Sequence, residues 1–210
     1  MANAYLMYLV WSATALQPKR NIHVFVCRPL EYSIFTDCSR IDGHRMLKRA
    51  MSSAPKLNPR NFPRPPLCEK NPRHLQVRWN EQVIADTKDA YWVLETHHPP
   101  TYYLPPSSLK VSLSPSSNSS YCEWKGRAKY FSLTNPSKPD EVVKNRIWTY
   151  EAPTEGFAPI KGYLSFYAGP WDCYVDGEKV EAQPGDFYGG WMTSDIERSS
   201  VKGGPGTWGW

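Results

Sequence analysis

Glu95 and His98 are the residues whose types and spacing most directly suggest chemistry. They stand three apart at the end of an expected strand, just before the rigid step Pro99-Pro100. A carboxylate beside an imidazole orients its tautomer and raises its basicity, which is the minimal arrangement for general acid or base catalysis. The structural alternative is that His98 hydrogen-bonds the loop backbone while Glu95 pairs with a nearby cation such as Lys125.

Cys122 and Lys125 form a second candidate cluster. A thiol near a cation ionises more easily, so Cys122 is a candidate nucleophile if Lys125 or His98 approaches it. Alternation along a strand would put Cys122 and Trp124 on one face and Lys125 on the other, so this approach requires a bend at Gly126. The alternative is a buried Cys122 that packs in an aromatic core beside Trp124.

Short alternating segments with turn residues between them must position these side chains. The turn residues Asn80-Glu81 and Asp176-Gly177 each predict a hairpin. Residues 106–113 have room for one or two helical turns, and residues 114–120 are expected to form a Ser-rich loop. The expected strands cover residues 76–79, 82–85, 91–95, 102–104, 121–125, 128–133, 146–150, 162–168, 173–175 and 178–180. This pattern predicts a compact antiparallel all-β domain.

Length and composition limit the class of protein. The chain has 210 residues, of which 40% are hydrophobic and 14% aromatic, so it holds enough core-forming side chains for one sizeable domain. Twenty prolines and thirteen glycines disfavour long helices, and no stretch has the roughly 18 apolar residues that a spanning helix needs. We expect a folded domain over residues 75–210, preceded by an unstructured extension over residues 1–74.

The net charge of +5 is unevenly distributed. Residues 1–74 carry twelve Lys or Arg and four Asp or Glu, whereas residues 75–210 carry thirteen and sixteen. The positive excess therefore lies in the extension, and the domain lacks the basic surface that a phosphate backbone requires. Neither a nucleic acid nor a membrane is expected as a partner of the domain.

The extension supports three interpretations. Residues 4–16 have the length of a signal-peptide core, but no Lys or Arg precedes them, and the basic residues 18–49 resemble a mitochondrial presequence in composition. The third interpretation, which we favour, is translation from Met51, with the preceding residues a mis-annotated start. A cytoplasmic location is then expected, with a mitochondrial or secreted protein as the alternatives if the extension is real.

The five cysteines include no CxxC pair, so no structural zinc site is expected. Cys122 and Cys173 lie well inside the domain, where either a disulfide or, as we favour, two reduced thiols would fit. No metal ion and no cofactor are predicted from these residues.

Six blocks of sequence and the C-terminal tail carry a family resemblance. The blocks are 75–85 (LQVRWNEQVIA), 93–104 (VLETHHPPTYYL), 122–130 (CEWKGRAKY), 148–153 (WTYEAP), 160–167 (IKGYLSFY) and 175–178 (VDGE), followed by the Gly- and Trp-rich residues 184–210. In residue identity, order and spacing they resemble the domain-of-unknown-function family 427. The most specific combination is ETxHPPxYY with CxWKG.

The resemblance implies a compact β fold akin to the β-tent, in which several short sheets pack together. Other β-tent domains hold ligands in aromatic cages, which by analogy makes Trp124, Trp148 and Tyr163 candidate ligand-binding residues. Of the adjacent Tyr102 and Tyr103, one is expected to pack and the other to offer its hydroxyl to the same pocket; Tyr103 is our candidate. The zinc and reductase chemistry of some β-tent proteins does not carry over, because their paired CxxC motifs are absent here.

Three functions remain open. The favoured one is binding of a small molecule in an aromatic-lined pocket, with Glu95, His98 and Lys125 converging on the ligand. Some collections label the family nucleotidyltransferase-like, but Asp172 and Asp176 lack the Gly-Ser loop and further carboxylates that nucleotidyl transfer needs. The third is a protein-interaction module without catalysis. The tail over residues 184–210 is expected to wrap back over the sheet.

Overall fold

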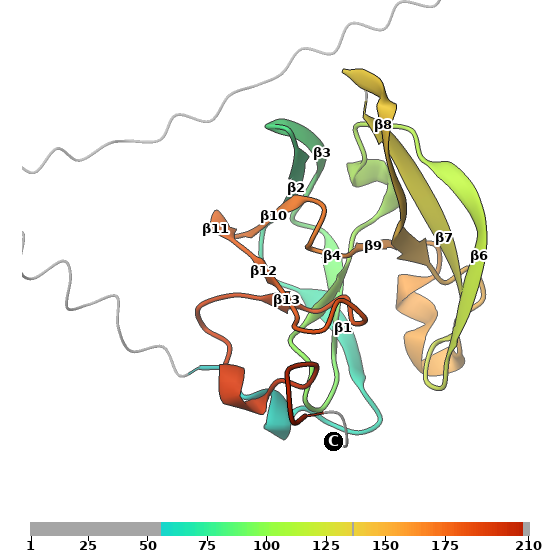
Figure 1. Cartoon of the computed structure of the whole chain (residues 1–210). Coiled ribbons are helices and arrows are strands. Elements are labelled where there is room, and N and C mark those ends of the chain that lie inside the picture. The colour runs from blue at the N-terminus through green and yellow to red at the C-terminus, as the bar shows by residue number, and fades with distance from the viewer. Residues whose placement is uncertain (1–55, 136, 208–210) are drawn as a thin grey trace, which may run out of the picture. The chain divides into compact units, whose positions relative to one another are not determined.

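The regular secondary structure of the described chain is mostly β-strand. The structure, a computed structural model, describes residues 56–135 and 137–207 (Figure 1). In this range the helical segments are the short 3-10 turns η1 (Pro59–Asn61), η2 (Pro106–Ser108), η3 (Glu155–Ile160) and η4 (Arg198–Ser200). All strand pairs are antiparallel, and they form several small sheets. The expected antiparallel all-β class is confirmed.

One four-stranded sheet has the order β11-β10-β2-β3. Its strands are β2 (Leu75–Trp79), β3 (Gln82–Thr87), β10 (Asp172–Val175) and β11 (Glu178–Lys179). The two predicted hairpins are confirmed, because Asn80 and Glu81 have φ of 49° and 66°, and Asp176 and Gly177 have φ of 51° and 84°. These positive angles are those of the tight turns that match strand twist.

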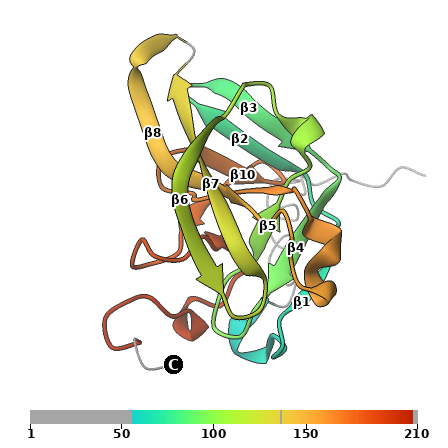
Figure 2. The same ribbon diagram turned by 90° about the vertical axis from the view of Figure 1, so that its right-hand side faces the viewer.

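The second four-stranded sheet has the order β6-β7-β8-β9 and faces the viewer in Figure 2. Its strands are β6 (Ser114–Cys122), β7 (Gly126–Asn135), β8 (Lys138–Thr149) and β9 (Leu164–Phe166). The expected Ser-rich loop at 114–120 is wrong, since these residues form most of β6. Their serines are mostly exposed while the backbone pairs with β7, for example Ser120 with Ala128, so pairing rather than side-chain burial makes the strand.

The three-stranded sheet has the order β1-β4-β5. Its first strand lies before residue 75, where the folded domain was expected to begin. It consists of β1 (Leu67–Asn71), β4 (Ala90–Leu94) and β5 (Thr101–Tyr103). The expectation that residues up to 74 are unstructured is wrong for 67–71, because β1 pairs along its whole length with β4 and the Trp92 Nε1 donates to Glu69 Oε1 at 3.0 Å. The expectations for residues 1–55 lie outside the described residues.

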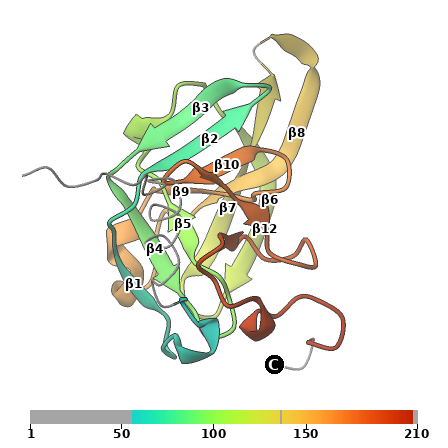
Figure 3. The same cartoon turned by 90° about the vertical axis from the view of Figure 1, so that its left-hand side faces the viewer.

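The tail folds back onto the domain. Strands β12 (Glu181–Ala182) and β13 (Trp191–Met192) pair with each other, on the side seen in Figure 3. The Trp191 side chain is fully buried, and Ile196 bridges to Leu57 near the other end of the described chain. The expected docking of the tail is confirmed for residues 184–207, while Trp208 and Trp210 lie outside the described residues.

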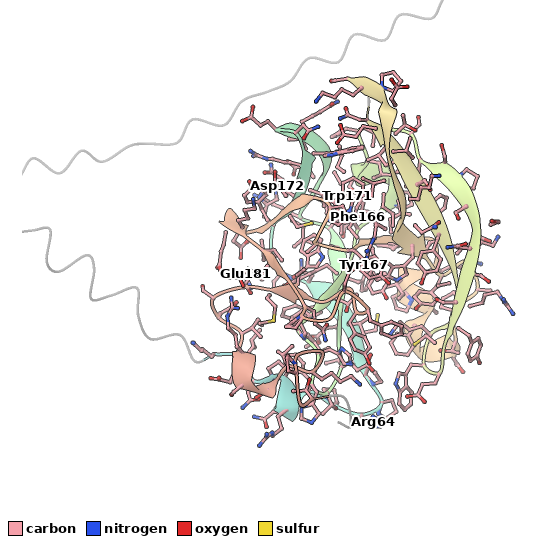
Figure 4. All side chains as sticks on the ribbon, viewed as in Figure 1. Arg64, Phe166, Tyr167, Trp171, Asp172 and Glu181 are labelled. Carbon is pink, nitrogen blue, oxygen red and sulfur yellow. The ribbon has the colours of Figure 1, made fainter. Side chains whose placement is uncertain are left out.

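Two aromatic-rich clusters form most of the core. The first is built around Tyr102, Phe166, Trp171 and Trp191, and the second around Tyr103, Trp148, Tyr150 and Phe157. Phe166 and Trp171 lie close together in the first, whereas Arg64 and Glu181 lie at the surface (Figure 4). Cys122 and Cys173 are both free thiols, so the disulfide alternative is not formed. No helix among the described residues is long and apolar enough to cross a membrane.

Candidate functional site

A cavity of about 350 Å³ opens beside the second cluster. Its walls come from the loop after β4, from strands β5 to β8 and from the tail. The lining residues are Glu95, His98, Thr101, Tyr103, Ser120, Tyr121, Cys122, Lys125, Tyr130, Trp148, Tyr150, Tyr167, Asp186, Phe187, Tyr188 and Gly189. We call this cavity the aromatic pocket. Six of the eight candidate site residues line it, and Trp124 and Tyr163 do not.

Glu95, His98 and Lys125 meet at one end of the pocket. The chain turns tightly after β4, since the His98 N–H donates to the Glu95 carbonyl at 2.9 Å and His97 adopts a φ of 65°. Glu95 Oε2 then lies 3.6 Å from Lys125 Nζ, and Glu95 Oε1 lies 3.8 Å from His98 Nε2. Glu95 therefore sits between the two, and its predicted pairing with Lys125 is confirmed.

The β6–β7 turn explains how Lys125 reaches the pocket. Strand β6 ends at Cys122, residues 123–125 form the turn, and β7 begins at Gly126 with a φ of 90°. The predicted strand over 121–125 is therefore too long, and alternation does not separate Cys122 from Lys125. Trp124 lies in this turn, half-buried against the second cluster, and the Arg64 guanidinium lies 5.3 Å from the centre of its ring. Activation of the Cys122 thiol by Lys125 or His98 stays a prediction.

His98 is buried and neutral at neutral pH. Burial lowers the pKa of His98 to about 4, against the opposing charge of Glu95, and the positive charge of Lys202 lowers it further. Its ring is edge-on to Tyr188, with ring centres 4.5 Å apart. The predicted hydrogen bond from His98 to loop backbone is replaced by one to the buried side chain of Gln183.

Tyr103 lines the pocket, but its hydroxyl oxygen is itself buried. Its side chain is fully buried, and its Oη makes no hydrogen bond to the described residues. Burial raises the pKa of Tyr103 well above its usual value, and the neighbouring Trp148 side chain opposes part of that rise. Tyr102 packs in the core against Trp191 with ring centres 5.2 Å apart, as expected for one of the two tyrosines. That Tyr103 offers its hydroxyl to a ligand stays a prediction.

Aromatic rings make the walls. Trp148 and Tyr167 have ring centres 4.7 Å apart, and Tyr130 lies opposite Trp148 in the sheet. Tyr163 instead packs edge-on against Tyr91, outside the pocket. Sequence reasoning missed Tyr130, although its place opposite Trp148 follows once β7 and β8 are paired.

The tail closes one side of the pocket through residues 186–189. Arg146 holds this segment by two hydrogen bonds to the Asp186 carboxylate, at 2.9 and 2.6 Å. Two of the lining residues are largely exposed: Phe187 to 70% and Tyr121 to 75%. The pocket thus has a solvent-exposed aromatic opening and a buried polar end.

Gly189 lets the tail lie directly on Trp148, which gives a first prediction. A Cβ at Gly189 would stand 2.1 Å from the Trp148 ring, so Gly189→Ala should lower the free energy of unfolding by about 1–3 kcal/mol through overpacking. Urea denaturation measures this change. Gly156→Ala is the control, because a Cβ there meets no atom within 4 Å. Equal effects of the two substitutions would contradict the contact.

Asp172 and Asp176, the carboxylates considered for nucleotidyl transfer, pair with basic groups of the domain. Asp172 pairs with Lys179 at 2.6 Å. Asp176 accepts from Arg73 Nε at 2.7 Å and from the His74 N–H at 2.9 Å, as the first residue of its turn. Within residues 56–135 and 137–207, no three His, Cys, Asp or Glu side chains are grouped so that they could hold a metal ion.

The family match covers the folded part from β1 to β11. Residues 67–179 match the family model described as "Domain of unknown function (DUF427)", which covers more than half of the chain. The match begins with β1 and includes Glu95, His98, Cys122 and Lys125, but it ends before the tail. No curated protein matches the chain.

Proposed function

Because the chain belongs to the DUF427 family, whose description names no activity, we propose from the pocket itself that the domain binds a small molecule. The ligand lies between the aromatic walls and reaches the end where Glu95, His98 and Lys125 meet. A volume of about 350 Å³ is in the range of small-ligand sites, and apolar walls with a few polar groups are typical of them.

A buried ammonium group without a close partner carries this proposal. Buried hydroxyl and ammonium groups in folded proteins nearly always have hydrogen-bond partners, because an unsatisfied one costs about 1–3 kcal/mol or more. The contacts of Lys125 Nζ among the described residues are Glu95 at 3.6 Å and the Phe157 ring centre at 5.5 Å, both longer than a hydrogen bond. A ligand polar atom at this end would give the Lys125 ammonium the hydrogen-bond partner it lacks.

The same end contains groups for acid–base chemistry, which makes catalysis the second step of the proposal. Glu95 can accept a proton, and a neutral His98 can give or take one. Cys122 lies on the same wall. Binding is the part that the geometry supports best, and turnover of a bound compound would be the sign of catalysis.

A pocket-filling variant tests the proposal in the full chain. The wild-type protein is screened by thermal shift against nucleotides, nucleosides, amines and common metabolites, with and without Mg²⁺, and a ligand should raise the melting temperature. Ser120 lies on the pocket wall at an exposed position, so Ser120→Trp should fill the pocket and weaken binding by at least about tenfold. Ser107→Trp is the matched control, since Ser107 is exposed in η2 and does not line the pocket.

The outcomes separate the functions. Loss of the shift in Ser120→Trp alone supports the pocket, whereas an unchanged shift in both variants would show that the compound binds elsewhere. A shift that depends on Mg²⁺ would favour the nucleotidyltransferase alternative. Absence of any shift would favour the interaction module, for which the specific observation is the exposure of Tyr121 and Phe187 at the mouth.

A further inference from the structure

The orientation of the Gln183 amide is fixed by its two neighbours. Gln183 is 2% exposed, and its Nε2 lies 2.9 Å from the Lys202 carbonyl oxygen. A carbonyl oxygen only accepts, so the amide atom facing it must be the NH₂ group. The second N–H of that group reaches His98 Nδ1 at 3.0 Å, while Gln183 Oε1 is farther from the same nitrogen, at 3.4 Å.

Gln183 therefore determines which nitrogen of His98 carries the proton. Because Nδ1 accepts from the amide, the neutral ring holds its proton on Nε2. Nε2 faces Glu95 Oε1 at 3.8 Å, which is longer than a hydrogen bond. This N–H remains available as a donor at the polar end of the pocket.

Two donors thus face a region in which each charged lining residue has an oppositely charged partner. They are the His98 Nε2–H and the Lys125 ammonium, whose residues line the pocket. Lys202, which is outside the lining, holds its Nζ 5.1 Å from the centre of the Tyr188 ring. The positive charge of Lys125 is balanced by Glu95 at 3.6 Å, and the Asp186 carboxylate at the mouth is balanced by Arg146. A ligand that brought a charge of either sign to the buried end would leave it uncompensated, which is costly in a low-dielectric site.

On the premise of the proposed function, we infer that the ligand is an uncharged planar molecule with a hydrogen-bond acceptor at its buried edge, and that Gln183 positions His98 to donate to it. A carbonyl oxygen or ring nitrogen has the required chemistry. The planar shape follows from the walls, since Trp148, Tyr167 and Tyr188 offer ring faces and edges in a cavity of about 350 Å³.

Four probes that share one ring test the ligand class: benzamide, benzoate, benzylamine and toluene. Each is titrated into the full-length ¹⁵N-labelled protein, and shifts of amides around Lys125 and Gly189 are followed. Benzamide should bind at least about tenfold more tightly than each of the others, because it alone brings an acceptor without a charge. Tightest binding of benzoate or benzylamine, or equal binding of toluene, would overturn the inference while leaving pocket binding intact. If no probe moves these amides, the inference and the proposed function both fail.

The tautomer is measured separately. Long-range ¹H–¹⁵N spectra distinguish a protonated from an unprotonated ring nitrogen, and His98→Gln assigns the signals. The wild-type protein should show a protonated Nε2 and an unprotonated Nδ1, and a protonated Nδ1 would overturn the assigned role of Gln183. Gln183→Met keeps the size of the side chain but removes its donor, so it should give mixed tautomers and weaken benzamide binding by about threefold or more.

A matched variant separates positioning from simple stability. Gln76→Met removes a polar amide from β2, a strand that contributes no residue to the pocket lining. It should leave the His98 signals and the benzamide affinity unchanged. Unaltered His98 signals in Gln183→Met would show that the amide does not set the tautomer.

Discussion

Replacing Trp191 by alanine is expected to lower the free energy of unfolding by about 3–5 kcal/mol, the typical cost of deleting a buried aromatic side chain. Trp191 is fully buried, its ring centre is 5.2 Å from that of Tyr102, and its Nε1 donates to the Phe166 carbonyl at 2.8 Å. The substitution leaves a cavity in the main core and an unpaired buried carbonyl. Urea denaturation followed by far-ultraviolet circular dichroism measures the change without depending on tryptophan fluorescence.

Two controls identify the source of the loss. Trp191→Phe keeps an aromatic ring but removes the donor to Phe166, so it should cost less than the alanine variant. Phe187→Ala changes an aromatic residue of the same tail that is 70% exposed, and it should change stability by only about 0.5 kcal/mol. If Trp191→Ala cost no more than Phe187→Ala, the tail would not be part of the core.

The elements that local chemistry determines could be predicted from the sequence. Asn80, Asp176 and Gly177 are residue types that tolerate the positive φ of a tight turn, whereas Glu81 adopts it without such a preference, and the flanking alternation sets the faces of β2 and β10. The meeting of Glu95 with Lys125 was predicted from charge alone. These features depend on residues that are close in sequence or on simple pairing of opposite charges.

The features that depend on distant partners could not be predicted. The serines of β6 have no strand pattern of their own, and only pairing with β7 makes them a strand. The end of β6 at Cys122 places Trp124 and Lys125 in a turn, where strand alternation no longer decides which side chains point inward, and Lys125 lines the pocket. Gln183 lies 85 residues from His98, and no local signal links the two.

Acidification should destabilise the protein through His98, which is the second large expected effect. The pKa of His98 falls from 6.5 to about 4 on folding, so between these values the unfolded chain binds more protons than the folded one. Stability therefore rises with pH in this window and is lost as the pH falls from about 6.5 towards 4. The full loss is on the order of 3 kcal/mol, from 1.36 kcal/mol per pKa unit.

The groups around His98 explain this direction and supply the control. Burial is the largest cause, and Glu95 opposes it while Lys202 and Lys125 reinforce it. His98→Gln removes the titrating ring, so its free energy of unfolding should depend less on pH between 6.5 and 4 than that of the wild type. Carboxylates with lowered pKa values, such as Asp86 and Asp186, also lose stabilisation in acid, but they do so in both proteins and cancel in the difference. Parallel pH profiles for the two proteins would mean that folding does not lower the pKa of His98. The assignment of a neutral imidazole to the polar end of the pocket would then be wrong.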